Sequence, residues 1–193
     1  MDTAKALVAD DKGLLAMDES NPTCNERFAK LGVPQTVEAR RTCQELIVTT
    51  SGLGEYISGA TIRQQDGTGA FFASILTAAG IIPGIKVDTC AKDLDGHPGE
   101  KITEGLDGLR ERLAEYSQMD ARFAKWRAAL TIGKGIPSRS CLEANAHALA
   151  RYGPVVGTDC ALSRPVDWRN VAGVRLATQI VLADRINRAT RVL

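Results

Sequence analysis

Two cations flank a tryptophan in the run Phe123-Ala124-Lys125-Trp126-Arg127. If this run is a strand, its side chains alternate between two faces, so Lys125 and Arg127 share one face and Trp126 takes the other. Two neighbouring cations are stable in a partly buried place only when an anionic group meets them. The pair therefore predicts a carboxylate partner or a phosphate ligand. The alternative is a solvated edge strand, on which the two cations keep the protein soluble.

Other charged residues follow runs that have the pattern of strands. The run Gly13-Leu14-Leu15-Ala16-Met17 is apolar on both faces, which is typical of a buried parallel strand, and it ends at Asp18. The run 84–88 alternates, and Lys86 and Asp88 share its polar face. In a parallel barrel such residues gather at one end of the strands. The expected cluster comprises Asp18, Lys86, Asp88, Lys125 and Arg127.

Helical patterns separate the predicted strands. Thr36 is the expected N-cap of a helix that runs to about Thr49. The expected core-facing stripe of this helix consists of Val37, Cys43, Leu46 and Ile47. The other expected helices span 3–9, 71–79, 106–117 and 136–152, a further strand spans 56–62, and 93–97 is expected to be loop.

Strands and helices thus alternate four times, which predicts an α/β fold with a parallel sheet. A (β/α)8 barrel of the TIM type places charged residues at the ends of several strands, and this pattern fits it. A flavodoxin-like sheet is the structural rival. That fold would need a Gly-rich phosphate loop after its first strand, and Asp18-Glu19-Ser20-Asn21-Pro22 is not such a loop.

The composition sets the class of protein. The 193 residues are 44% hydrophobic and 24% charged, as in a globular domain, and a net charge of +1 predicts no nucleic-acid or membrane partner. No apolar run is long enough to span a membrane and no leader pattern is recognisable, so we expect a cytoplasmic protein. The scattered cysteines predict reduced thiols and no metal site: Cys24, Cys43, Cys90, Cys141 and Cys160.

Six blocks of the sequence resemble class I fructose-bisphosphate aldolase, and they occur in that family's order. The resemblance covers about residues 3–152. The blocks are Gly13–Ser20, Thr49–Ala60, Pro83–Asp88, Gly105–Leu109, Phe123–Arg127 and Leu149–Tyr152.

This resemblance implies a (β/α)8 barrel that reversibly splits fructose 1,6-bisphosphate into dihydroxyacetone phosphate and glyceraldehyde 3-phosphate, a step of glycolysis and gluconeogenesis. It implies a lysine Schiff base as electron sink, no metal, no cofactor and a homo-oligomer. By position, Asp18 and Lys125 resemble catalytic residues of the family. Arg27, Lys86 and Arg127 resemble its substrate-binding residues.

The sequence departs from the family in three places. Glu26 stands where the family commonly has a lysine, which puts phosphate affinity beside Arg27 in doubt, and the segment 61–72 is shorter. After Tyr152 the family's two catalytic glutamates and its Schiff-base lysine are not recognisable. No lysine follows Lys134 and no glutamate follows Glu143.

We therefore expect a partial barrel of about four βα units over 1–152 and an unrelated, Arg-rich tail over 153–193. A shifted reading frame is one hypothesis for that tail. It can be drawn as a basic helix from Val174 to Ala189, or as a poorly ordered segment. Four strands cannot close an eight-stranded barrel, so two open sheet edges are expected, and with them dimerisation or aggregation.

Two functions remain open at this point. The first is an aldolase by family that lacks its Schiff-base lysine and is inactive alone. The second is a non-catalytic half-barrel that binds phosphosugars or forms oligomers.

Overall fold

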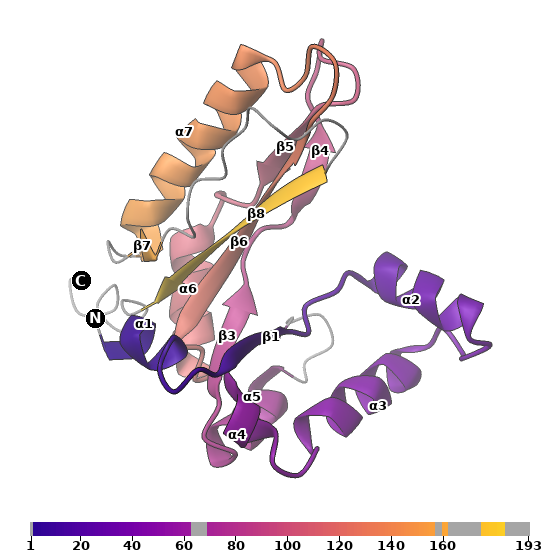
Figure 1. Ribbon diagram of the computed structural model, residues 1–193, viewed down its shortest axis with the longest axis vertical. Coiled ribbons are helices and arrows are strands. Elements are labelled where there is room, and N and C mark those ends of the chain that lie inside the picture. Colours follow the sequence, from indigo (N-terminus) through magenta and orange to yellow (C-terminus); the bar gives the residue numbers. More distant parts are fainter. Residues whose placement is uncertain (1, 63–68, 157–159, 162–174, 184–193) are drawn as a thin grey trace.

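A six-stranded sheet forms the centre of the molecule, in the order β1-β2-β3-β6-β8-β7, and a separate hairpin pairs β4 with β5 (Figure 1). The computed structural model describes residues 2–62, 69–156, 160–161 and 175–183. The strands of the large sheet are β1 (Gly13–Ala16), β2 (Ile57–Ile62), β3 (Ile82–Lys86), β6 (Phe123–Thr131), β7 (Cys160–Ala161) and β8 (Arg175–Ala183). The hairpin consists of β4 (Cys90–Asp93) and β5 (Lys101–Glu104).

Helices connect the strands on the outer side of the sheet. The connecting helices are α2 (Asn21–Lys30), α3 (Val37–Val48), α4 (Leu53–Tyr56), α5 (Gly69–Ala78), α6 (Leu109–Gln118) and α7 (Arg139–Val156), and a further helix, α1 (Asp2–Leu7), precedes β1. The pairs β1–β2, β2–β3 and β3–β6 are all parallel. The predicted parallel sheet of about four βα units is confirmed, and these four strands form a curled half-barrel.

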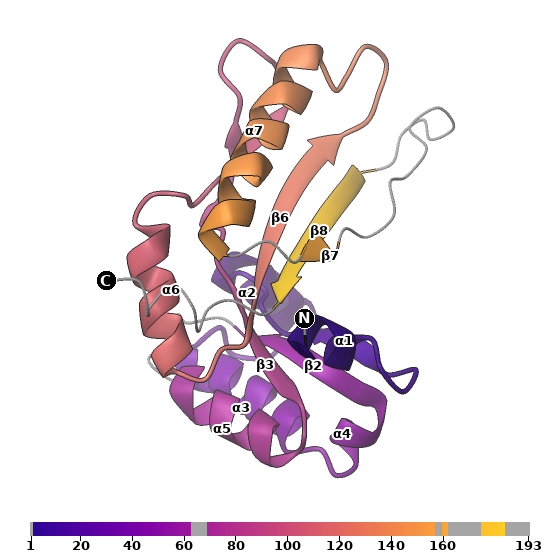
Figure 2. The same ribbon diagram turned by 90° about the vertical axis from the view of Figure 1, so that its left-hand side faces the viewer.

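Strand β8 covers the far edge of the parallel strands. It pairs antiparallel with β6 along nine residues, from Phe123 opposite Ala183 to Thr131 opposite Arg175 (Figure 2). The expected open edge beside β6 is therefore wrong, and so is the basic helix where it overlaps β8. Unpaired N–H and C=O groups along β6 offer a partner to any extended segment, which outweighs the weak helical pattern. The rest of the tail 153–193, apart from the end of α7 and β7, lies outside the described residues.

The opposite edge is strand β1, which is more exposed than its sequence predicted. Leu14 is 47% exposed and only Met17, just after the strand, is buried. An apolar run on both faces reads as two-sided burial. Here β1 pairs on one side only, with β2, within the described part of the chain, and so the expectation of a fully buried strand is wrong.

Helices α6 and α7 bury the outer face of β6. Trp126 has no exposed surface, and its ring lies 5.1 Å from that of Tyr152 on α7, centroid to centroid, at an angle of 34°. Figure 2 shows both helices along the same side of β6. The predicted alternation, with Trp126 facing away from the cations, is confirmed.

Helix α3 begins at the predicted cap, because the Thr36 hydroxyl accepts a hydrogen bond from the Ala39 N–H at 3.2 Å. The predicted core-facing stripe is wrong in part. Leu46 is 71% exposed, and burial shifts instead to Val48 near the helix end, which packs with Phe72 and Leu76 of α5. Of the segment 61–72, which we predicted to be shortened, residues 63–68 lie outside the described residues.

The inner face of the sheet is packed tightly at its amino end. Leu7 of α1 and Phe123 of β6 form a small buried cluster there. The Phe123 ring occupies the space that a side chain on Gly84 would need: an added Cβ would lie 2.3 Å from the ring. A methyl group at Gly59 would meet Leu7 at the same distance. Gly84 and Gly59 therefore leave the space that Phe123 and Leu7 occupy.

The loop that we predicted around 93–97 is the turn of the β4–β5 hairpin, and only Asp93 of it belongs to a strand. The two short strands that flank this turn were not predicted. Thr103 Oγ1 donates to the carbonyl of Arg127 at 2.9 Å, which fixes the hairpin to β6. At the hairpin end, the buried Glu100 carboxylate accepts a hydrogen bond from the Ser138 N–H, just before α7. Hydrogen bonding from the Ser138 side chain, and less so from this N–H, lowers the pKa of Glu100 below its usual value, so the carboxylate stays ionised at the helix start.

Candidate active site

Asp18, Thr61 and Lys125 meet inside the curl of the sheet, level with the carboxyl end of β3. Lys125 Nζ lies 2.6 Å from Asp18 Oδ1, and Thr61 Oγ1 donates to the same oxygen at 2.7 Å. The Lys125 and Asp18 side chains are only 5% and 7% exposed. Three separate strands supply this group, since Asp18 follows β1 while Thr61 lies on β2 and Lys125 on β6. Of the two predicted alternatives, a carboxylate partner or a phosphate ligand, the structure shows a carboxylate partner at Lys125.

Lys86 lies beside this group on the next strand. Lys86 of β3 is the direct register partner of Lys125 of β6, so the two side chains leave the same face of neighbouring strands. Lys86 Nζ forms an ion pair with Asp88 and also donates to the Asp88 carbonyl at 3.1 Å. The carboxylate thus offsets the second lysine, as Asp18 offsets the first.

Asp88 also connects two strands. Its Oδ2 accepts a hydrogen bond from the Arg127 N–H at 3.0 Å, while its Oδ1 meets Lys86. Only 3% of the Asp88 side chain is exposed. A single buried carboxylate therefore holds the end of β3 and the middle of β6 in register.

The two cations that flank Trp126 differ in burial. Both lie on the same face of β6, as the alternation predicted, but Lys125 is buried whereas the Arg127 side chain is exposed. No carboxylate of the described residues pairs with the Arg127 guanidinium. Lys86, Lys125 and Arg127 line the inner face of β3 and β6, which we call the wall of the site. Arg127 is the cation of this wall that is open to an incoming anion.

Arg27 stands apart from the other four predicted site residues. It lies on α2, is 63% exposed and pairs with Glu19, the residue after Asp18. The neighbouring Glu26 pairs with Lys30 at 3.0 Å, one turn further along the same helix. The repelling charge that we inferred at Glu26 thus has its own partner. The structure places Arg27 next to the Asp18 loop without bringing it to the buried lysines.

Sequence reasoning did not select Thr61 or Asp88 as site residues. Thr61 reads as an ordinary β-branched strand residue, and its only signal is that it is polar within the buried run 57–62. Asp88 was grouped with the charged strand ends but given no role. Its position two residues after Lys86, on the same face, was the available signal.

The site consists of two largely buried ion pairs, Lys125 with Asp18 and Lys86 with Asp88. A buried ammonium next to a carboxylate can donate a proton or a hydrogen bond to a substrate oxygen, and the carboxylate can accept one. No cluster of three or more His, Cys, Asp or Glu side chains suited to a metal ion occurs among the described residues. Nor is any helix in that part of the chain long and apolar enough to cross a membrane.

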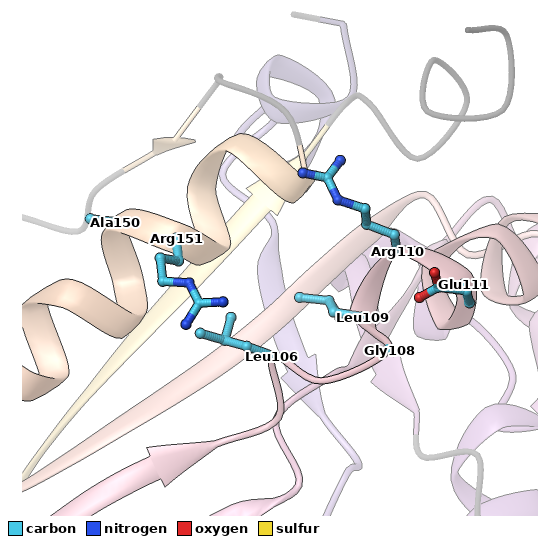
Figure 3. Close-up of a pocket in the computed structure, with 7 residues that line it drawn as sticks. All are labelled: Leu106, Gly108, Leu109, Arg110, Glu111, Ala150 and Arg151. Atoms are coloured by element: carbon cyan, nitrogen blue, oxygen red, sulfur yellow. The ribbon is translucent and has the colours of Figure 1, made fainter. Parts of the chain in front are cut away.

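A separate cavity of about 430 Å³ opens between α6 and α7. Its lining contains none of the site residues above. Figure 3 shows Arg151 of α7 beside Leu106, with Arg110 and Glu111 at the start of α6. Trp126 faces these helices and Lys125 faces the opposite way, so the cavity belongs to the outer helical layer.

Comparison with known proteins agrees with the geometry. The family model described as glycolytic fructose-bisphosphate aldolase class-I matches residues 1–162. The chain is 56% identical over 156 residues to a probable fructose-bisphosphate aldolase class 1 of Xanthomonas axonopodis, which covers 78% of this chain and 47% of that protein. It is 44% identical over 161 residues to the chloroplastic fructose-bisphosphate aldolase 1 of Chlamydomonas reinhardtii, covering 79% and 42%.

A solved structure gives the same result. The fructose-bisphosphate aldolase of Plasmodium falciparum superposes with a TM-score of 0.75 at 38% identity, covering 80% of this chain and 46% of that one. This chain therefore spans about half the length of the relatives it matches. This partial coverage is consistent with four parallel strands that form a curl and not a closed barrel. The chain belongs to the class I fructose-bisphosphate aldolase family.

Proposed function

We propose that this chain binds a sugar phosphate of the fructose 1,6-bisphosphate type inside the curl of its sheet, and that it does not complete aldol cleavage alone. In this proposal Asp18 and Lys125 contact the reacting part of the substrate, while Lys86, Arg127 and Arg27 contact its oxygens and phosphates. The observation that carries the proposal is the buried contact of Asp18 with Lys125, beside the register partner Lys86.

The charges of the wall support an anionic ligand. Two carboxylates, Asp18 and Asp88, offset Lys125 and Lys86, which leaves the exposed Arg127 in excess. A phosphate group carries about −1.5 to −2 charges near neutral pH, and arginine can bind it through two parallel hydrogen bonds. Arg127 would therefore make the first phosphate contact, and the buried lysines would hydrogen-bond the sugar oxygens.

The proposal that cleavage is incomplete rests on the sequence. Cleavage through a Schiff base needs a lysine amine that attacks the substrate carbonyl. The last lysine of the chain is Lys134, which is exposed in the turn after β6, and the last glutamate is Glu143 on α7. Neither falls in a stretch that resembles the family's Schiff-base strand. The reversible cleavage of fructose 1,6-bisphosphate would then need a Schiff-base lysine that this sequence does not supply.

One observation favours the second candidate, a half-barrel that binds phosphosugars without chemistry. Strand β8 fills the place beside β6 along its whole length, and the sequence Arg175–Ala183 contains neither lysine nor glutamate. A strand of this composition closes the edge of the sheet but supplies no lysine amine for a Schiff base.

Ligand titration tests the binding part. We expect fructose 1,6-bisphosphate to raise the melting temperature of the full chain, and inorganic phosphate to do so less, because only the sugar reaches the buried lysines. The variants Lys86→Met and Arg127→Met should weaken this response, whereas Lys134→Met, an exposed lysine outside the wall, should not. An unchanged melting temperature at millimolar ligand would refute the binding site.

Borohydride trapping tests the chemical part separately. The chain is incubated with dihydroxyacetone phosphate, reduced, and analysed by peptide mass spectrometry. We expect no lysine adduct. An adduct on Lys86, Lys125 or another lysine would contradict the claim that the chain lacks a Schiff-base residue, while leaving the binding result intact.

We also propose a homo-oligomer in the cytoplasm. The exposed strand β1 supports the first, since an edge strand can pair with a second copy, and the relatives include a cytosolic aldolase of Arabidopsis thaliana as well as chloroplastic ones. Sedimentation across a concentration series checks the oligomer, and a strictly monomeric profile would overturn it.

A further inference from the structure

Two cysteines that belong to no common sequence motif lie on neighbouring helices. Cys24 is on α2 and Cys43 is on α3, and both are free and partly exposed. Their spacing matches no known metal or redox motif, so the sequence alone predicted unrelated thiols. The other cysteines lie elsewhere in the fold: Cys90 is on the hairpin, Cys141 is buried at the start of α7 and Cys160 is on β7.

Helices α2 and α3 touch each other at the level of these thiols. Arg40 Nη1 on α3 donates to Asn25 Oδ1 on α2 at 2.8 Å, and also to the carbonyl of Gln35 in the connecting loop at 3.3 Å. Asn25 is the residue after Cys24. Cys43 lies three residues after Arg40, on the same side of α3. The contact that joins the helices therefore also brings the two cysteines to the same junction.

The second thiol also contributes to the electrostatics of Cys24. Burial is the first cause that raises the pKa of the Cys24 thiol, and the neighbouring Cys43 is the second, ahead of Glu19. Arg40 and Arg27 act in the opposite direction and favour the thiolate. The Arg40 Nε–H is buried and meets no acceptor among the described residues. The Arg40 guanidinium, with one unused N–H donor, thus lies beside Cys24 and Cys43.

We propose that Cys24 and Cys43 form a dithiol site that a low-molecular-weight disulfide oxidises to an intramolecular disulfide. One cysteine thiolate attacks the small disulfide, forms a mixed disulfide and releases one small thiolate. The second cysteine thiolate then attacks the sulfur of the first and releases the other small thiolate. The two cysteines lose two electrons and two protons, and the small disulfide becomes two thiols.

This bridge would connect segments that hold the backbone on both sides of Asp18. Ser20, two residues after Asp18, caps α2 through a hydrogen bond from the Thr23 N–H at 3.3 Å. Gln44, next to Cys43, donates to the carbonyl of Met17 at 3.4 Å. Oxidation would therefore restrain the strand end and loop that position Asp18, whatever ligand the site takes.

The test uses the full chain, fully reduced and then incubated with oxidised glutathione under native conditions. We expect trypsin to release the peptides 13–27 and 42–63 joined, with a mass two hydrogens below their sum. The variants Cys24→Ser and Cys43→Ser should lose the joined peptides and keep glutathione on the remaining cysteine. The matched variant Cys90→Ser, which removes another partly exposed thiol, should keep the joined peptides.

A second measurement does not depend on the variants folding. Dibromobimane becomes fluorescent only when it links two nearby thiols, and we expect it to link Cys24 with Cys43 in the unmodified chain. The proposal fails if bimane links no such pair, or if glutathione caps Cys24 and Cys43 separately. It also fails if the main disulfide joins either of them to Cys90, Cys141 or Cys160, or if urea-unfolded chain gives the same pair in the same yield.

Discussion

The two faces of strand β6 are built on different principles. The outer face is apolar, and Trp126 packs there against Tyr152 under α6 and α7. The inner face carries Lys125, whose charge is matched by Asp18 at the end of β1, three places away in the sheet. Burial of an apolar ring is favourable by itself, whereas burial of a lysine is tolerable only with its partner in place. The outer face therefore depends on volume and the inner face on charge balance.

The largest effect is expected on the outer face. Trp126→Ala removes the largest fully buried side chain and its contact with Tyr152, so we expect a loss of about 4–5 kcal/mol of unfolding free energy. Denaturant unfolding followed by circular dichroism measures it. Trp126→Phe keeps a ring and should lose clearly less. An equal loss for both variants would show that volume does not govern this face.

A smaller effect, with a different signature, is expected on the inner face. Asp18→Asn leaves the Lys125 ammonium buried without its carboxylate, which should lower the unfolding free energy by about 3 kcal/mol. The double variant with Lys125→Met removes both charges, so it should lose less than Asp18→Asn alone. A double-mutant cycle in denaturant measures this coupling. Additive losses would mean that the two charges do not depend on each other.

The smallest effect is expected in the packing of the inner face at the amino end of the sheet, where Phe123 lies against Gly84. Gly84→Ala places a methyl group against the Phe123 ring, so we expect a loss of about 1–3 kcal/mol from overpacking. Adding Phe123→Leu should restore part of that loss by making room. Gly13→Ala is the matched control, because the nearest atoms to its added methyl group lie 3.9 Å away. Equal melting temperatures for the two alanine variants would show that the inner face is loosely packed.

The alternating pattern of β6 could be read from the sequence because it is local. Lys125 and Trp126 were assigned to opposite faces by the period of a strand alone, and the Thr36 cap located the start of α3 in the same way. Patterns of this kind depend only on neighbouring residues. They predicted the alternation of strands and helices in a parallel sheet, and an anionic group, either a carboxylate or a phosphate, next to the cations of β6.

Features that depend on distant segments were not predictable. The exposure of Leu14 follows from the edge position of β1, and the strand form of Arg175–Ala183 follows from the free edge of β6. The hairpin β4–β5 is rich in charged and turn residues, so it reads as loop until Glu100 and Thr103 find their partners. Thr61 could not be selected because its role exists only once Asp18 lies beside it.

The parallel strands also follow one another in the sheet in the order in which they are synthesised. Each of β2, β3 and β6 pairs with the parallel strand made just before it. Asp18 emerges from the ribosome 107 residues ahead of Lys125, but only 43 residues ahead of Thr61. On a nascent chain the threonine hydroxyl is thus the first partner that the carboxylate can meet. Until Lys125 is synthesised, only the Thr61 hydroxyl of these two partners is available to the carboxylate.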